Sequence, residues 1–181
     1  LLFLTSTFIC LSAQQEQIDK DFKPQFGQAG KDVRWEPTPR IVVEKMLDIA
    51  KVTSMDYVID LGSGDGRTVI TAAKRGARAR GIEYDANMVV LSKRNATDEG
   101  VNDRAEFIQG DLFEADLSQA TVITLYLLPR INLRLRPMLL ELKPGTRIVS
   151  NSHTMNDWIP DEADKDIKDG DRLYIVFLIR E

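Results

Sequence analysis

The stretch Asp60-Leu61-Gly62-Ser63-Gly64-Asp65-Gly66 decides the fold of this chain. Its first glycine, Gly62, follows a short apolar and β-branched run, 57–61. Its last glycine, Gly66, begins a segment with helical spacing, 66–75. Glycines between a buried strand and a helix permit a tight turn and let the backbone approach a ligand closely. The stretch therefore predicts a strand, a glycine loop and a helix, with a nucleotide-like ligand bound at the loop.

Strand-like and helical segments alternate outward from this loop. The expected strands are 57–61, 79–84, 105–109, 121–127, 147–151 and 173–179, and the expected helices are 39–51, 66–75, 86–99 and 130–142. Thr38 and Pro39 resemble a cap and a first helical residue, and Pro137 is expected to split the last helix. The turn Asp169-Gly170 predicts that the final strand is antiparallel. This alternation is typical of an α/β protein with a doubly wound, mostly parallel sheet, which binds ligands at the carboxyl ends of its strands.

The N-terminal residues differ in character from the rest of the chain. Residues 1–11 form an uncharged apolar run, and the small residues Ser12 and Ala13 follow it. Residues 1–13 are therefore predicted to be a signal peptide or part of a membrane anchor. Residues 14–32 are polar with proline and glycine, and we expect a flexible arm there. With 181 residues in total, one domain over 33–181 is expected. The segment implies export, to the periplasm or outside the cell, or membrane association, and we expect the protein to be a monomer.

Composition narrows the possible chemistry. The formal net charge of -4 argues against a protein that holds nucleic acid chiefly by neutralising phosphates, so no nucleic-acid partner is expected. Cys10 is the only cysteine and lies in the apolar N-terminal run, while His153 is the only histidine. Neither a thiolate nor a multi-histidine metal site is therefore expected in the body of the chain.

Acidic residues stand at the ends of three successive predicted strands. Asp60 would repel a pyrophosphate but attract an ammonium or sulfonium group, and the third glycine, Gly66, is too close to Gly64 for a dinucleotide loop. Glu83 is placed to accept hydrogen bonds from ribose hydroxyls, and Asp111 to accept one from an exocyclic adenine amine. The pattern indicates a positively charged nucleoside rather than NAD.

These residues resemble the motifs of the class I, seven-strand S-adenosylmethionine-dependent methyltransferases, over about residues 37–180. The resemblance implies a Rossmann-like methyltransferase fold and S-adenosyl-L-methionine as cofactor. It places the methionine part on the loop, the ribose beside the end of the second strand and the adenine after the third. The implied cofactor-binding residues are Thr38, Asp60, Gly62, Ser63, Gly64, Gly66, Glu83, Tyr84, Asp111 and Leu112.

The methyl acceptor is less clearly indicated. Tyr126, at the end of the fourth strand, is a candidate catalytic residue that orients an acceptor amine, or else an ordinary core aromatic. Two segments, 35–39 (Trp-Glu-Pro-Thr-Pro) and 126–129 (Tyr-Leu-Leu-Pro), are similar to those of small, often membrane-anchored or exported relatives of mitochondrial and archaeal protein-lysine methyltransferases. This resemblance implies a protein lysine as acceptor. Alternatives are a small-molecule or lipid-associated methyltransferase and a noncatalytic nucleoside-binding protein.

Overall fold

The computed structural model describes residues 22–180, so the predicted signal peptide and residues 14–21 of the predicted arm lie outside the described residues. Seven strands form one sheet in the order β3-β2-β1-β4-β5-β7-β6. The strands are β1 (Tyr57–Leu61), β2 (Arg78–Glu83), β3 (Ala105–Gln109), β4 (Val122–Leu125), β5 (Arg147–Asn151), β6 (Glu162–Asp169) and β7 (Arg172–Arg180). The first five are parallel, and β7 pairs antiparallel with both β5 and β6, as predicted for the final strand.

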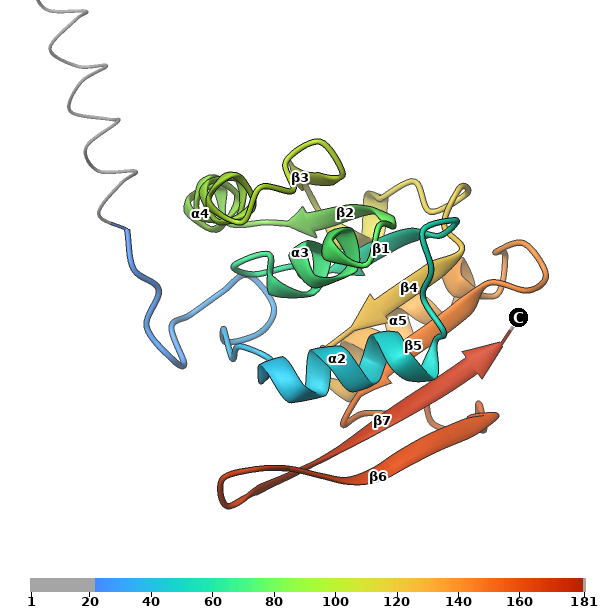
Figure 1. Ribbon diagram of the computed structural model, residues 1–181. Coiled ribbons are helices and arrows are strands. Elements are labelled where there is room, and N and C mark those ends of the chain that lie inside the picture. The colour runs from blue at the N-terminus through green and yellow to red at the C-terminus, as the bar shows by residue number, and fades with distance from the viewer. Residues whose placement is uncertain (1–21, 181) are drawn as a thin grey trace, which may run out of the picture.

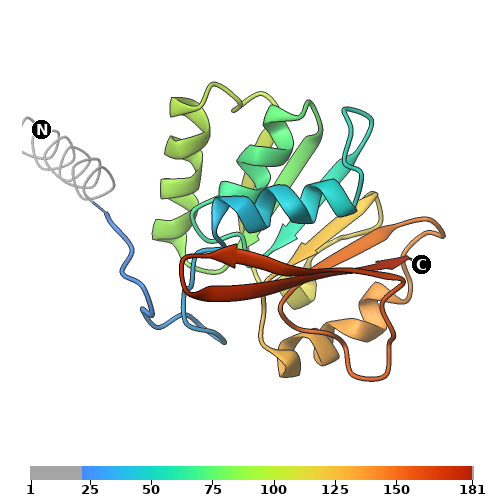
Figure 2. The same cartoon turned by 60° about the horizontal axis from the view of Figure 1, so that its bottom comes forward.

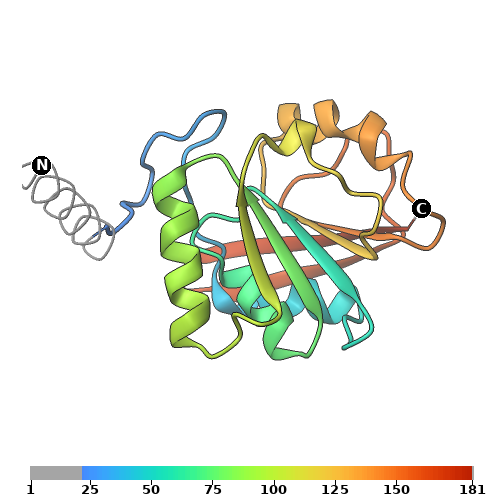
Figure 3. The same cartoon turned by 90° about the horizontal axis from the view of Figure 1, so that it is seen from above.

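Helices cover both faces of the sheet (Figures 1 and 3). On one face lie α2 (Arg40–Ile49), α3 (Arg67–Lys74) and α4 (Ala86–Asp98), and on the other lies α5 (Pro129–Leu139) with the short helix η1 (Leu112–Glu114). Each face has its own apolar core, built on residues such as Val43, Val58 and Val69 on the first and Ile59, Ile123 and Leu135 on the second. The doubly wound arrangement predicted from the sequence is therefore confirmed.

Three local features differ from the sequence expectations. Residues 162–169, which are not among the expected strands, form the edge strand β6, which lies beside β7 in the antiparallel pair brought forward in Figure 2. The opening helix begins at Arg40 rather than 39, and Thr38 does not cap it, since its N-cap residue is Pro39 with no side-chain hydrogen bond. Pro137 lies within α5 instead of splitting it, because it comes in the last turn where only one backbone bond is lost.

The first βα turn is packed tightly against its neighbours. Gly66 precedes α3 with φ +83°, and a Cβ there would lie 2.7 Å from the Phe107 ring and 2.9 Å from Ser92. By contrast, Gly100 at the end of α4 has φ +68° with open space around it. Gly66 is thus required both for its backbone conformation and for its lack of a side chain.

Replacing Gly66 by alanine should lower the free energy of unfolding clearly more than replacing Gly100. Both variants force an alanine into positive φ, which costs on the order of 1 kcal/mol, but only Gly66→Ala adds a steric clash. Urea unfolding of both variants beside the parent protein measures the difference. Equal losses of stability would show that the contact with Phe107 does not constrain the turn.

Candidate functional site

The glycine loop lies at the carboxyl ends of β1 and β2. The backbone N–H groups of Gly62 and Ser63 both donate to the Ile82 carbonyl, at N···O distances of 2.9 and 3.1 Å. These bonds hold the loop against the neighbouring strand. The backbone of the loop is therefore fixed before any ligand binds.

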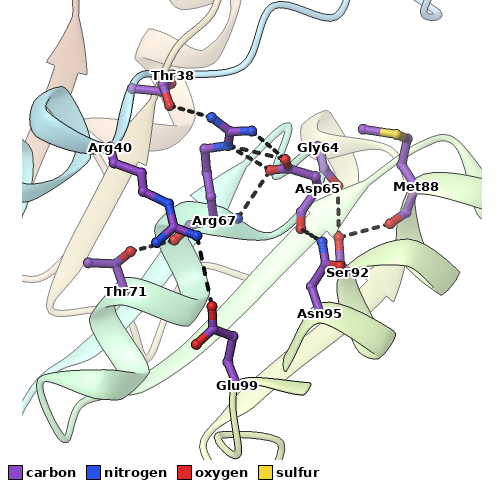
Figure 4. Close-up of polar contacts among 10 residues, drawn as sticks. All are labelled: Thr38, Arg40, Gly64, Asp65, Arg67, Thr71, Met88, Ser92, Asn95 and Glu99. Carbon is purple, nitrogen blue, oxygen red and sulfur yellow. Dashed lines mark hydrogen bonds and ion pairs between the residues drawn. The ribbon is translucent and has the colours of Figure 1, made fainter. Parts of the chain in front are cut away.

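Side chains from the helices on one face fasten the rest of the loop (Figure 4). Ser92 of α4 donates its hydroxyl to the Gly64 carbonyl at 2.8 Å, and Asn95 donates to the Asp65 carbonyl at 2.9 Å. Arg67 pairs with the Asp65 carboxylate and also donates to the Thr38 carbonyl at 2.9 Å. The loop is thus tied to α4 on one side and to the N-terminal segment on the other.

Glu83, at the end of β2, is oriented by backbone groups. Its carboxylate accepts hydrogen bonds from the Gly64 N–H at 2.9 Å and from the Asp85 N–H at 3.0 Å. A carboxylate offers about four lone-pair sites, so further acceptor capacity remains for a ligand. The geometry suits a fixed acceptor for paired hydroxyl groups.

Asp60, at the end of β1, is a buried carboxylate that accepts a hydrogen bond from the Thr124 hydroxyl at 2.6 Å. Burial raises the pKa of Asp60 to about 7, and the charge of Glu83 acts in the same direction. A positively charged ligand would stabilise the ionised form that the protein alone disfavours. Asp60 therefore prepares the site for a cation rather than for a phosphate.

Asp111 follows β3 and begins η1, where its carboxylate accepts from the Phe113 N–H at 3.0 Å. The Lys31 ammonium contacts the same carboxylate at 2.5 Å and lies 4.4 Å from the centroid of the Tyr84 ring. Hydrogen bonding to Lys31 and to the backbone lowers the pKa of Asp111 below its ordinary value. A ligand amine that donates to Asp111 must share it with Lys31 or displace Lys31.

Two cavities adjoin these acids. A larger one of about 610 Å³ includes Glu83, Tyr84, Asp111 and Leu112 in its lining, and a smaller one of about 40 Å³ lies beside Asp60. The smaller cavity is lined by Trp35, Glu36, Pro37, Thr38, Met46, Asp60, Gly62, Ser63, Gly64, Asp65, Arg67, Thr68 and Tyr126. Nine of the ten predicted cofactor-binding residues therefore line one cavity or the other. The exception is Gly66, which lines neither and packs against Phe107.

Residues 27–35 form an N-terminal hairpin that sequence reasoning did not anticipate. Gly27 N–H donates to the Trp35 carbonyl at 2.8 Å, and Trp35 N–H donates to the Gln28 carbonyl at 2.9 Å. The Arg130 guanidinium holds the hairpin at the Asp32 carbonyl. Residues 28–36 all line the larger cavity, so the part of the predicted arm that the structure describes covers the site.

Tyr126 lies half-buried just after β4 and lines both cavities. Burial and the neighbouring Glu36 carboxylate raise the pKa of Tyr126 to about 12, so its hydroxyl stays protonated. His153 lines the larger cavity as well. Within residues 22–180 no group of three or more histidine, cysteine, aspartate or glutamate side chains is arranged to hold a metal ion.

The site fits a sulfonium nucleoside on observations of this structure alone. The larger cavity falls in the size range of small-molecule sites, and it holds one oriented carboxylate for hydroxyl groups and another for an amine. Asp60 supplies a buried negative charge, and the Ser63 hydroxyl is buried without a partner. Hydroxyl, amine and cation acceptors thus line two neighbouring cavities that share part of their walls.

A family model described as the ANTKMT methyltransferase domain matches residues 60–162. A protein-lysine N-methyltransferase of Saccharolobus islandicus is 44% identical over 81% of this chain and 92% of its own length. A human lysine N-methyltransferase of an ATP synthase subunit is 36% identical over 59% of this chain and 46% of its own length. This chain therefore spans nearly all of the archaeal relative but about half of the human one.

A solved structure with 48% sequence identity matches with a TM-score of 0.75, covering 80% of this chain and 93% of that one. It is described as an RNA methyltransferase from Salinibacter ruber in complex with S-adenosyl-L-homocysteine. The match supports the same fold.

The buried charge of Asp60 should make the ligand-free protein less stable at alkaline pH. An aspartate ordinarily has a pKa of 3.8, so the native state keeps a proton up to about pH 7 that the unfolded chain releases near pH 4. Stability is therefore lost as pH rises through this window. We expect Asp60→Asn to be more stable than the parent at pH 8, with a smaller gain at pH 5.

Urea unfolding at the two pH values, without ligand, measures this difference. Asp103→Asn, at a carboxylate that is 70% exposed, is the control and should show little pH-dependent difference. A gain for Asp60→Asn that is the same at pH 5 and pH 8 would contradict the assignment of a buried, titrating carboxyl.

Proposed function

The chain belongs to the ANTKMT methyltransferase domain family, and we propose that this S-adenosylmethionine-dependent methyltransferase transfers methyl to a lysine side chain of a protein. The observation that carries the proposal is that Asp60, Glu83 and Asp111 line two neighbouring cavities at the glycine loop. The names of the archaeal and human relatives support lysine as the acceptor.

Each acid has a distinct role toward the cofactor in this proposal. Glu83 accepts from the ribose hydroxyls, Asp111 from the adenine amine, and Asp60 attracts the positive charge of the methionine part. Bound S-adenosylmethionine supplies a methyl group that the lone pair of a neutral amine attacks, while the electron pair of the broken C–S bond remains on sulfur. The residues themselves position and desolvate the reactants, which is sufficient for an in-line displacement.

A protein acceptor agrees better with the charge of the chain than RNA does. The formal net charge is -4, and two of the three lysine and arginine side chains that line the larger cavity are engaged, Lys31 with Asp111 and Arg130 with the Asp32 carbonyl, while the third is Arg34. A phosphate backbone would need several uncommitted cations near the site. RNA, the substrate class in the name of the Salinibacter methyltransferase, is the second candidate, and a small molecule or lipid is the third.

Glu83→Gln should weaken the binding of S-adenosylhomocysteine by about tenfold or more. The amide keeps one acceptor oxygen but loses the charge-assisted hydrogen bonds to ribose, which contribute roughly 1.5–3 kcal/mol each. Titration calorimetry of the parent, Glu83→Gln and the exposed control Glu141→Gln measures the change. Unchanged affinity in Glu83→Gln would remove the ribose assignment, and no binding by the parent would remove the cofactor site.

Labelling a cell extract with radioactive S-adenosylmethionine and the purified protein tests the acceptor. We expect the label in protein and, after acid hydrolysis, in methylated lysine. Label in RNA or in the organic phase, with none in protein, would contradict a lysine acceptor. A mixture heated before the enzyme is added controls for methyltransferases of the extract.

We further propose that residues 1–13 bring the enzyme to a membrane or export it, as their apolar run suggests. Within residues 22–180 no helix is long and apolar enough to cross a membrane. Mass spectrometry of the N-terminus in membrane, soluble and exported fractions tests this proposal. Intact chains confined to the soluble fraction would contradict it.

A further inference from the structure

Four residues line both cavities: Trp35, Glu36, Gly62 and Tyr126. They stand between the larger cavity, with its acceptors for ribose and adenine, and the smaller one beside Asp60. Under the proposed function, the sulfonium centre of the methyl donor lies between the two cavities. Among the four, Glu36 has the only ionisable carboxylate.

Glu36 is held in place by an ion pair with another part of the fold. The Arg172 guanidinium, at the start of β7, makes an ion pair with Oε1 of Glu36. Tyr126, at the end of β4, lines the same two cavities as Glu36. Arg172 is itself positioned by the Phe26 ring, whose centroid lies 5.2 Å away. The ion pair with a positioned arginine holds Glu36 at the boundary between the two cavities.

Glu36 also remains accessible. Its side chain is 38% exposed, and a carboxylate has lone pairs beyond the one that meets Arg172. Donors that arrive from solvent can therefore reach it without breaking the ion pair. The neighbouring Tyr126 hydroxyl has lone pairs that can accept an N–H.

A lysine acceptor creates an electrostatic problem that a carboxylate at this point reduces. The ε-amine arrives as an ammonium and must approach a positively charged methyl donor, and two like charges at close range repel strongly in a partly desolvated site. A fixed carboxylate close to both the ammonium and the positively charged methyl donor offsets that repulsion during the approach. The ammonium then loses one proton to solvent water, and Tyr126 accepts a hydrogen bond from the neutral amine.

Resting on the proposed function, we propose that Glu36 is the docking group for the acceptor ammonium, with Tyr126 orienting the amine and Arg172 acting as a positioning residue for Glu36. This assigns acceptor binding to the segment that joins the N-terminal hairpin to α2. The acceptor site is thus built from three elements that are far apart in the sequence. The cofactor contacts of Asp60, Glu83 and Asp111 are separate from it.

Binding of a minimal probe tests this assignment independently of turnover. The probe is N-acetyl-lysine methylamide, titrated by NMR into protein saturated with S-adenosylhomocysteine, and its norleucine analogue lacks the ammonium. We expect Glu36→Gln to weaken lysine-probe binding by about tenfold or more, and Glu36→Asp by less. The dissociation constant for S-adenosylhomocysteine should stay within about twofold.

Asp157→Asn is the matched control, because Asp157 also pairs with an arginine, Arg136, but lines neither cavity. It should change neither affinity. The proposal is overturned if Glu36→Gln binds the lysine probe as tightly as the parent does, or if it loses affinity for S-adenosylhomocysteine by the same factor as for the probe. It is also overturned if the parent protein fails to bind the lysine probe, or binds the norleucine analogue equally well. Labelling of extract protein by the parent tests the lysine acceptor separately, so the two failures are distinguishable.

Discussion

The close packing of the glycine loop is the constraint on which the site depends. Gly62, Gly64 and Gly66 all have positive φ, and their carbonyls and N–H groups are tied to β2, to α4 and to Glu83. The loop can approach a ligand closely only because its glycines have no side chains. For the same reason Trp35 can lie against Gly64, where a Cβ would be 2.9 Å from the indole nitrogen. Loop, second strand and N-terminal segment therefore form one unit.

That unit brings several carboxylates close together, and their negative charges destabilise the protein when no ligand is bound. Asp60 is buried, Glu83 is close enough to raise its pKa, and Glu36 lines the same small cavity. Such an arrangement is unfavourable for folding and favourable for binding a cation, which is the usual relation between stability and function at a binding site. The chemistry of methyl transfer explains the arrangement, because both the donor and the incoming lysine are positively charged.

The sequence predicted the parts of the fold that are local. Strands β3 and β5 have their predicted bounds, and the three acids lie at strand ends as expected, because apolar runs, glycine turns and strand–helix alternation are short-range signals. It did not predict β6, whose acidic residues suit an exposed edge strand but carry no hydrophobic pattern. Nor did it predict the N-terminal hairpin, which is local but lies in a polar, glycine-containing segment without a strand pattern. The Glu36–Arg172 pair was not predicted because it joins residues far apart in the chain and depends on packing. The contact of Gly66 with Phe107 is of the same long-range kind.

A crystal structure of the protein with S-adenosylhomocysteine tests the central claim most directly. The account predicts ribose hydroxyls on Glu83, the adenine amine on Asp111 with Lys31 moved or sharing that carboxylate, and the sulfur between the two cavities beside Glu36 and Tyr126. A ligand bound outside these cavities, or bound there with its ribose away from Glu83, would contradict the account.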